Sequence, residues 1–122
     1  MTVFFYDSYA VIEYINNNSR FAHYFEENTG ILTIFNLVEI YYAVLNHAGK
    51  EKADLVFEFL FPITVEPNKE TIKEAMRFRW EQKKMKLSYA DSIGYKMASE
   101  RKILFLTGDS QFKDMENVIF IK

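Results

Sequence analysis

Residues 103–109 read ILFLTGD, an unbroken apolar run that leads into an aspartate. Residues 4–7, FFYD, repeat this arrangement near the start of the chain. Short apolar runs of β-forming residues that are bounded by turn or cap residues predict buried strands. Both runs are followed by helix-start or turn signals. We therefore expect Asp7 and Asp109 to lie just beyond the carboxyl ends of two buried strands.

Apolar runs and helical periodicity alternate along the rest of the chain. Strands are predicted at residues 4–6, 31–35, 63–65 (a weak one), 103–106 and 118–121. Helices are predicted to begin at Ser8 and Ser19, to cover 37–47 and 50–61, to run from Asn68 towards Lys86, and to begin at Ser88. Strands that alternate with helices through short connections indicate a parallel sheet with helices on both faces. The expected fold is a three-layer α/β sandwich with about five strands.

The composition is typical of one compact domain, which we expect to span residues 1–122. Hydrophobic residues make up 49% of the chain, which has four glycines, two prolines and no cysteine. The absence of cysteine excludes a disulfide scaffold, a thiolate zinc site and a cysteine nucleophile, so any metal must be bound by oxygen or imidazole. No apolar run approaches 18 residues, and residues 1–7 lack the basic start of a signal peptide. We expect a cytoplasmic protein that does not enter a membrane.

Two further acids interrupt apolar helix segments. Glu39 lies in the segment LVEI at 37–40, and Asp91 lies in YADSI at 89–93. In this class of sheet, ligands bind outside the carboxyl ends of the strands. The first turn of a helix that follows a strand lies over the same edge, so Glu39 and Asp91 are expected to join the two strand-end aspartates there.

Each acid also has a structural interpretation. Aspartate is among the best helix N-caps, so Asp7 and Asp109 could cap the segments that follow them. The pairs Asn36/Glu39 and Ser88/Asp91 fit the capping-box spacing or a close variant of it. Caps can occur at either end of a sheet, whereas one topology would bring all four acids to a single edge. Their joint placement favours a functional cluster.

The four acidic segments resemble the motifs of PIN domains and, among them, the toxin ribonucleases of VapC type. The resemblance covers the whole chain and rests on FYDS at 5–8, LVEI at 37–40, LSYAD at 87–91 and LTGDSQF at 106–112. It implies a parallel sheet of order 3-2-1-4-5 and hydrolysis of single-stranded RNA. It also implies a Mg²⁺ or Mn²⁺ centre held by the four acids, Asp7, Glu39, Asp91 and Asp109.

The same resemblance implies a homodimer and, for the toxin branch, inhibition by a small antitoxin protein. Ser8 and Thr107 correspond to hydroxyl positions that the family often keeps beside the metal. Hard divalent cations prefer oxygen ligands, which suits a chain with four such acids and no cysteine. We expect the three aspartates to be the principal ligands. Glu39 would bind the metal through water or position the nucleophile.

The charge is unevenly distributed along the chain. Residues 1–61 contain three basic and eight acidic residues, whereas residues 62–122 contain twelve basic and nine acidic ones. Much of the basic excess comes from the segment between residues 77 and 86, namely Arg77, Arg79, Lys83, Lys84 and Lys86. With Phe78 and Trp80 between them, these residues could bind an RNA backbone and stack a base. The alternative is an ordinary solvated helix face.

The leading functional hypothesis is a metal-dependent endoribonuclease that acts as the toxin of a type II toxin–antitoxin pair. One alternative is a catalytically silent PIN-like domain that binds proteins, and another is an RNA-processing nuclease outside such a pair. Two histidines, His23 and His47, are too few and too separated to build a histidine ribonuclease site. Neither of the common glycine-rich nucleotide-binding motifs occurs.

Overall fold

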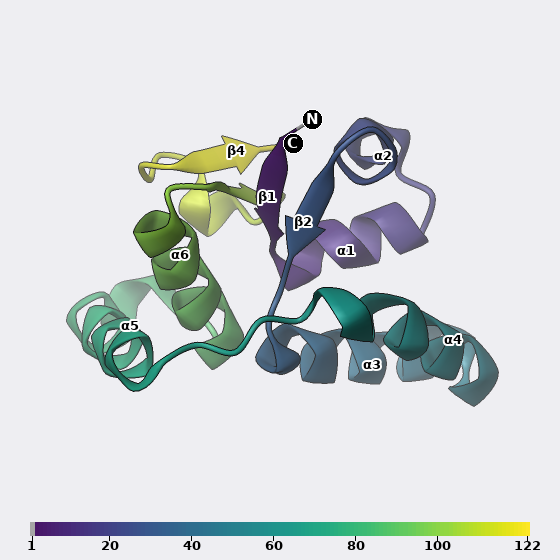
Figure 1. The fold of residues 1–122 in the computed structure, drawn as a ribbon, viewed down its shortest axis with the longest axis horizontal. Coiled ribbons are helices and arrows are strands. Elements are labelled where there is room, and N and C mark those ends of the chain that lie inside the picture. Colours follow the sequence, from purple (N-terminus) through teal and green to yellow (C-terminus); the bar gives the residue numbers. More distant parts are fainter. Residues whose placement is uncertain (1) are drawn as a thin grey trace.

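A computed structural model describes residues 2–122 and contains one parallel sheet with helices around it (Figure 1). The strands are β1 (Val3–Tyr6), β2 (Thr29–Ile31), β3 (Leu104–Thr107) and β4 (Val118–Phe120), in the order β2-β1-β3-β4. The α-helices are α1 (Ser8–Ile15), α2 (Ser19–Glu26), α3 (Ile34–Ala48), α4 (Lys50–Leu60), α5 (Lys69–Glu81) and α6 (Tyr89–Arg101). The predicted α/β architecture is confirmed.

The helices occupy three positions around the sheet. Figure 1 shows α5 and α6 on one side of the strands, α1 and α2 on the other, and the α3–α4 pair beyond the end to which β1 and β2 point. Helix α6 packs on β1 and β3, while α1 contacts β3 and α3. The N-termini of α1, α3 and α6 therefore meet near the carboxyl edge of the sheet. No helix within residues 2–122 is long and apolar enough to span a bilayer.

The sheet has four strands where about five were expected. The weak strand predicted at 63–65 is reduced to one parallel bridge between Leu32 and Thr64. Its neighbours Phe61–Ile63 form a 3₁₀ turn instead. Pro62 lies in the first positions of this turn, where its fixed φ is compatible with a helical turn and its missing N–H cannot contribute to a strand ladder.

The second strand begins and ends earlier than predicted. It covers Thr29–Ile31, where the sequence reading ended the preceding helix, and it stops before the predicted range 31–35 is complete. Residues 29–31 pair in parallel with residues 3–5 of β1, and Gly30 permits this pairing because a Cβ at this position would collide with the Tyr6 ring. The glycine is needed for close strand packing, not for a helix-ending turn.

Helix α3 begins at Ile34 because Thr33 caps it. The Thr33 hydroxyl accepts a hydrogen bond from the Asn36 backbone N–H, and the Asn36 side chain accepts one from the Thr33 N–H. This reciprocal capping box satisfies two backbone donors and outweighs the β-propensity of the preceding apolar run. As a result Ile34 and Phe35 lie on the exposed surface of a helix, not in a buried strand.

Close packing between α6 and the sheet brings Asp91 towards the strand ends. Gly94 allows this packing, because a Cβ there would collide with the ring of Phe5 on β1. The Phe5 and Phe105 rings stack beneath the helix with their centroids 5.7 Å apart, and both are fully buried. Helix α6 therefore carries Asp91, one turn before Gly94, to the edge where β1 and β3 end.

Helix α5 is shorter than predicted. It ends at Glu81, a 3₁₀ turn follows at Lys83–Met85, and Lys86 adopts a left-handed backbone conformation with φ of 53°. The basic segment therefore does not form one continuous helix face. Its two arginines lie on α5, and its three lysines lie in the turn that leads to α6.

Candidate active site

Asp7 is the most buried acid of the site. It follows β1 directly, and only 1% of its surface is exposed. Its Oδ2 accepts a 2.7 Å hydrogen bond from Thr107 Oγ1, whereas its Oδ1 has no hydrogen-bond partner. Asp7 occupies the N-cap position of α1, but its side chain makes no capping hydrogen bond. The helix-cap interpretation of this side chain is therefore wrong.

The surroundings of Asp7 disfavour its charged form. Burial raises the pKa of Asp7 well above its ordinary range, and the carboxylates of Asp91 and Asp109 raise it further, while the Thr107 hydrogen bond acts in the opposite direction. A buried carboxylate with an unpartnered oxygen and acidic neighbours is costly to maintain. A bound cation would relieve both costs.

Asp91 combines two roles at the start of α6. The predicted capping box is confirmed, because Asp91 Oδ2 accepts a 2.8 Å hydrogen bond from the Ser88 N–H and Ser88 Oγ accepts one from the Asp91 N–H at 3.0 Å. Partial burial nevertheless raises the pKa of Asp91, and the nearby Asp109 adds to this effect against the two Ser88 hydrogen bonds. The capping hydrogen bond therefore holds the Asp91 carboxylate in place beside Asp7.

Asp109 lies two residues beyond β3. Its Oδ1 accepts a 3.0 Å hydrogen bond from the Gln111 N–H and so caps the short 3₁₀ turn Ser110–Phe112. Its own N–H donates to Thr107 Oγ1 at 3.0 Å. The cap interpretation of Asp109 is confirmed, and Thr107 links this acid to Asp7.

Glu39 is oriented by a chain of buried hydrogen bonds. Ser8 Oγ donates to Glu39 Oε1 at 2.8 Å, and Asn36 Nδ2 donates to Ser8 Oγ at 2.9 Å. Asn36 also accepts a 2.8 Å hydrogen bond from Thr33 Oγ1. Burial raises the pKa of Glu39, while the Ser8 hydrogen bond lowers it. Since Thr33 and Asn36 form the capping box of α3, Glu39 lies in the second turn and takes no part in it.

Sequence reasoning missed the role of Asn36 at this site. It treated Asn36 as the residue that opens the helix, whereas the structure buries it completely and places its amide between Thr33 and Ser8. The available signal was a polar residue three positions after a threonine within an otherwise apolar stretch, which is itself a capping-box spacing.

The four acids gather at one edge of the sheet without forming a complete ligand set on their own. Within residues 2–122, no three His, Cys, Asp or Glu side chains are grouped closely enough to enclose a metal ion. Mg²⁺ usually needs only one or two carboxylates, since it keeps waters and takes phosphate oxygens from the substrate. The all-oxygen donors and the unpartnered Asp7 Oδ1 fit such a cation.

The basic residues fall into two groups. Arg79 donates from Nε to the Leu87 carbonyl oxygen at 2.7 Å and lies over the Tyr89 ring, 4.7 Å from its centroid. Lys83 lies over Trp80, 5.6 Å from the ring centroid. Arg77, Lys83, Lys84 and Lys86 are exposed, whereas Arg79 is half-buried beside the acidic site. The segment is thus not one uniform solvated face.

Comparison with known families agrees with this geometry. The family model described as PIN domain matches residues 4–118. The chain belongs to the PIN domain family. The matched range contains all four acids and both hydroxyl residues at the sheet edge. PIN domains are generally nucleases that use divalent metal ions, so this chain is a member of a nuclease family.

A solved structure shows the same PIN fold. A chain from "Toxin-antitoxin complex from Klebsiella pneumoniae" superposes with a TM-score of 0.72 at 11% sequence identity, covering 98% of this chain and 96% of that one. This likeness extends over nearly the whole length of both chains and confirms the fold. No curated protein sequence matches the chain.

Proposed function

We propose that this PIN domain is a Mg²⁺- or Mn²⁺-dependent endoribonuclease that cleaves single-stranded RNA, and that it is the toxin of a toxin–antitoxin pair. The observation that carries the proposal is Asp7, a fully buried carboxylate with an unpartnered oxygen beside two further acids. Neither a helix cap nor an ion pair explains this side chain. A catalytic cation does.

In this proposal each acid has a separate task. Asp7, with Asp91 and Asp109 beside it, would hold the cation together with waters and phosphate oxygens of the substrate, and the cation would supply Lewis-acid stabilisation of the phosphate charge and an activated water. Thr107 orients Asp7 through its 2.7 Å hydrogen bond. Asp91 is oriented by the Ser88 backbone.

Glu39 orients the attacking water. The Ser8 hydroxyl holds Oε1 with a 2.8 Å hydrogen bond and so fixes the carboxylate that would accept a hydrogen bond or a proton from that water. Because burial raises the pKa of Glu39, this group is a better proton acceptor than an ordinary glutamate. The expected products carry a 5′-phosphate and a 3′-hydroxyl.

The RNA backbone is proposed to follow the basic segment. The exposed residues Arg77, Lys83, Lys84 and Lys86 supply charge without any ion pair to a protein carboxylate in the described chain. Half-buried Arg79 lies on the wall of a pocket that Glu39 also lines. Phosphate contacts of this kind position a strand independently of its sequence.

A small antitoxin is the proposed protein partner, and the similar Klebsiella structure, a toxin–antitoxin complex, supports this choice. A homodimer is proposed from apolar side chains on α3 and α4 that remain exposed, among them Val38, Tyr42, Leu55 and Phe59. We propose one PIN domain over residues 1–122 that acts on cytoplasmic RNA.

The direct test is cleavage of single-stranded RNA by the purified protein. Cleavage should require Mg²⁺ or Mn²⁺, stop in excess chelator and be lost in Asp7→Asn. Asp91→Asn, prepared in parallel, controls for contaminating ribonucleases, since Asn can keep the cap. Metal-dependent cleavage of RNA by the wild type but by neither variant supports the proposal. Folded protein that cleaves no RNA with either metal would instead favour the silent protein-binding module.

A further inference from the structure

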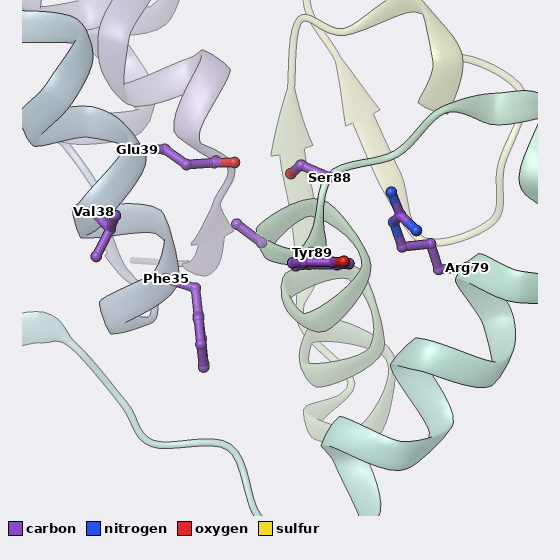
Figure 2. Close-up of a pocket in the computed structure, with 7 residues that line it drawn as sticks. Phe35, Val38, Glu39, Arg79, Ser88 and Tyr89 are labelled. Carbon is purple, nitrogen blue, oxygen red and sulfur yellow. The ribbon is translucent and has the colours of Figure 1, made fainter.

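A pocket opens next to Glu39, between the first two turns of α3 and the first turn of α6 (Figure 2). Its volume is about 480 Å³, within the range of roughly 300–1,000 Å³ that small-molecule sites usually occupy. Phe35, Val38 and Glu39 line it from α3, while Ser88 and Tyr89 line it from the start of α6 and Arg79 from α5. Figure 2 shows these two groups facing each other across the opening.

The aromatic rings of this pocket are available for stacking. Tyr89 is 62% exposed and Phe35 is 38% exposed, although both belong to well-formed helices. Val38 extends the same wall and is exposed as well. Rings that remain accessible inside a pocket provide flat apolar surfaces on which a nucleobase can stack.

The cation beside these rings is fixed in place but not neutralised. The Arg79 Nε is used by the Leu87 carbonyl, and the guanidinium lies 4.7 Å from the centre of the Tyr89 ring. Arg79 forms no salt bridge within residues 2–122. Its two terminal nitrogens can therefore bind an anion that approaches the pocket, and phosphate suits this planar group.

We infer that the pocket holds one unpaired base of the RNA substrate, the base of the nucleotide next to the phosphate that is cut. Tyr89 and Phe35 supply the stacking surfaces, and Arg79 binds the phosphate attached to that nucleotide. The inference rests on the proposed ribonuclease activity and adds a base-binding subsite to it. Glu39 links the two, since it lines the pocket and belongs to the acidic cluster.

The alternative occupant is a side chain of a protein partner. The observations favour the base for two reasons. The pocket has an unneutralised cation within reach of an aromatic ring, which suits a nucleotide with its base and phosphate better than an apolar side chain. The pocket is also lined by Glu39, one of the four acids beside which a scissile phosphate has to lie if the site is catalytic.

The test uses the full chain with Asp91→Asn as the parent, so that RNA is bound but not cut. The probe is a short single-stranded RNA that carries a fluorescent adenine analogue, whose emission changes when it stacks. Tyr89→Ala should weaken binding about tenfold or more and remove the emission change. Tyr89→Phe keeps the ring and should behave like the parent. Phe61→Ala, which removes an exposed aromatic ring outside the pocket and outside the proposed dimer surface, is the control.

A second probe removes the base instead of the tyrosine. The probes are RNAs that each carry one abasic nucleotide at a different position. The parent should bind one of them about tenfold more weakly than the intact RNA. At that position Tyr89→Ala should cause no additional loss, because ring and base act as a pair. Equal binding by the parent and Tyr89→Ala, or an equal loss for RNA with and without the base, would overturn the inference and leave the pocket to a protein partner.

The cleavage activity of the protein that retains Asp91 separates this inference from the proposed function. If that protein cuts RNA with metal but Tyr89→Ala binds RNA normally, the base-binding proposal is wrong and the ribonuclease proposal is supported. If it cuts no RNA yet the stacking signal still depends on Tyr89, the nuclease proposal fails and the base pocket remains.

Discussion

The Thr107 hydroxyl donates a 2.7 Å hydrogen bond to Asp7 Oδ2, joining residues 100 positions apart, and accepts the Asp109 N–H at 3.0 Å. One side chain thus ties together acids that follow two different strands. Thr107 is fully buried, so water cannot replace either bond when the hydroxyl is removed.

Thr107→Val should therefore destabilise the protein. The change keeps the shape but removes the hydrogen bond that Thr107 donates to the Asp7 carboxylate, and we expect a loss of about 1–3 kcal/mol near neutral pH. Thr107→Ser retains the hydroxyl and serves as the control. Urea unfolding of the three proteins in chelator is the measurement, and equal stabilities would mean that this hydrogen bond does not stabilise the ionised carboxylate.

Removing the charge of Asp7 should stabilise the metal-free protein. Because the folded-state pKa of Asp7 is raised above its ordinary value of 3.8, the folded protein binds the proton more tightly than the unfolded chain. The stability associated with this proton is present below pH 3.8 and is lost as the pH rises through the folded-state pKa. Near neutral pH, the ionised group is a net cost.

Asp7→Asn should accordingly melt at a higher temperature than the wild type near neutral pH in chelator. A gain of about 1 kcal/mol would correspond to roughly 4 °C in a domain of this size. The difference should shrink as the pH is lowered towards 4, where the wild-type carboxyl regains its proton. If Asp7→Asn were less stable than the wild type at every pH, the ionised Asp7 carboxylate would not be a net cost to the metal-free protein.

Divalent cations should stabilise the wild type and not the site variants. With free Mg²⁺ or Mn²⁺ at a hundred times its dissociation constant, the gain should be about 2.7 kcal/mol. Asp7→Asn and Asp91→Asn should lose most of this gain, whereas Glu58→Gln, which changes an exposed acid on α4, should keep it. Thermal melts with and without metal measure the effect, and equal shifts in all four proteins would exclude a cation at these aspartates.

The Ser8–Glu39 hydrogen bond should be visible in the titration of Glu39. Ser8 donates to the ionised carboxylate and lowers the pKa of Glu39, against the larger effect of burial. Ser8→Ala should raise this pKa further, and Ser8→Thr should leave it closer to the wild-type value. Carboxyl chemical shifts followed by NMR across the acidic range provide the measurement. A lowered pKa in Ser8→Ala would show that the hydroxyl does not stabilise the charge.

The exposed lysines before α6 should account for much of the salt dependence of RNA binding. Replacing Lys83, Lys84 and Lys86 by Gln should reduce the log–log salt slope by roughly 0.7 for each contact that is lost. Lys50→Gln/Lys52→Gln is the control, because α4 and α5 lie at opposite sides of the molecule (Figure 1). An unchanged slope in the triple variant would mean that the RNA follows another path.

Much of the fold could be predicted because its signals are local. The apolar runs before Asp7 and Asp109 form β1 and β3, and Ser88 caps α6 as its spacing with Asp91 predicts. Strand propensity and cap chemistry depend on residues only a few positions apart. The convergence of the four acids followed from these elements together with the topology of a parallel sheet.

Pairing with β1 decided where the second strand lies, whereas a local cap decided where α3 begins. Glycine is required at position 30 because the Tyr6 ring occupies the space a side chain would need, and that ring comes from a residue far away in the sequence. The predicted strand at 31–35 failed because the Thr33–Asn36 capping box competes with β-propensity, and the Asn36 amide gains a further partner in Ser8 only in the folded chain.

The sequence by itself determined which acids reach the carboxyl edge of the sheet, since strand ends and helix starts are specified by neighbouring residues. Only the tertiary structure decided what each acid does there. Asp91 and Asp109 accept backbone hydrogen bonds as caps, whereas Asp7 has an oxygen with no partner and Glu39 is held by Ser8. Burial and hydrogen bonding depend on residues brought together from distant parts of the chain, and no local pattern contains that information.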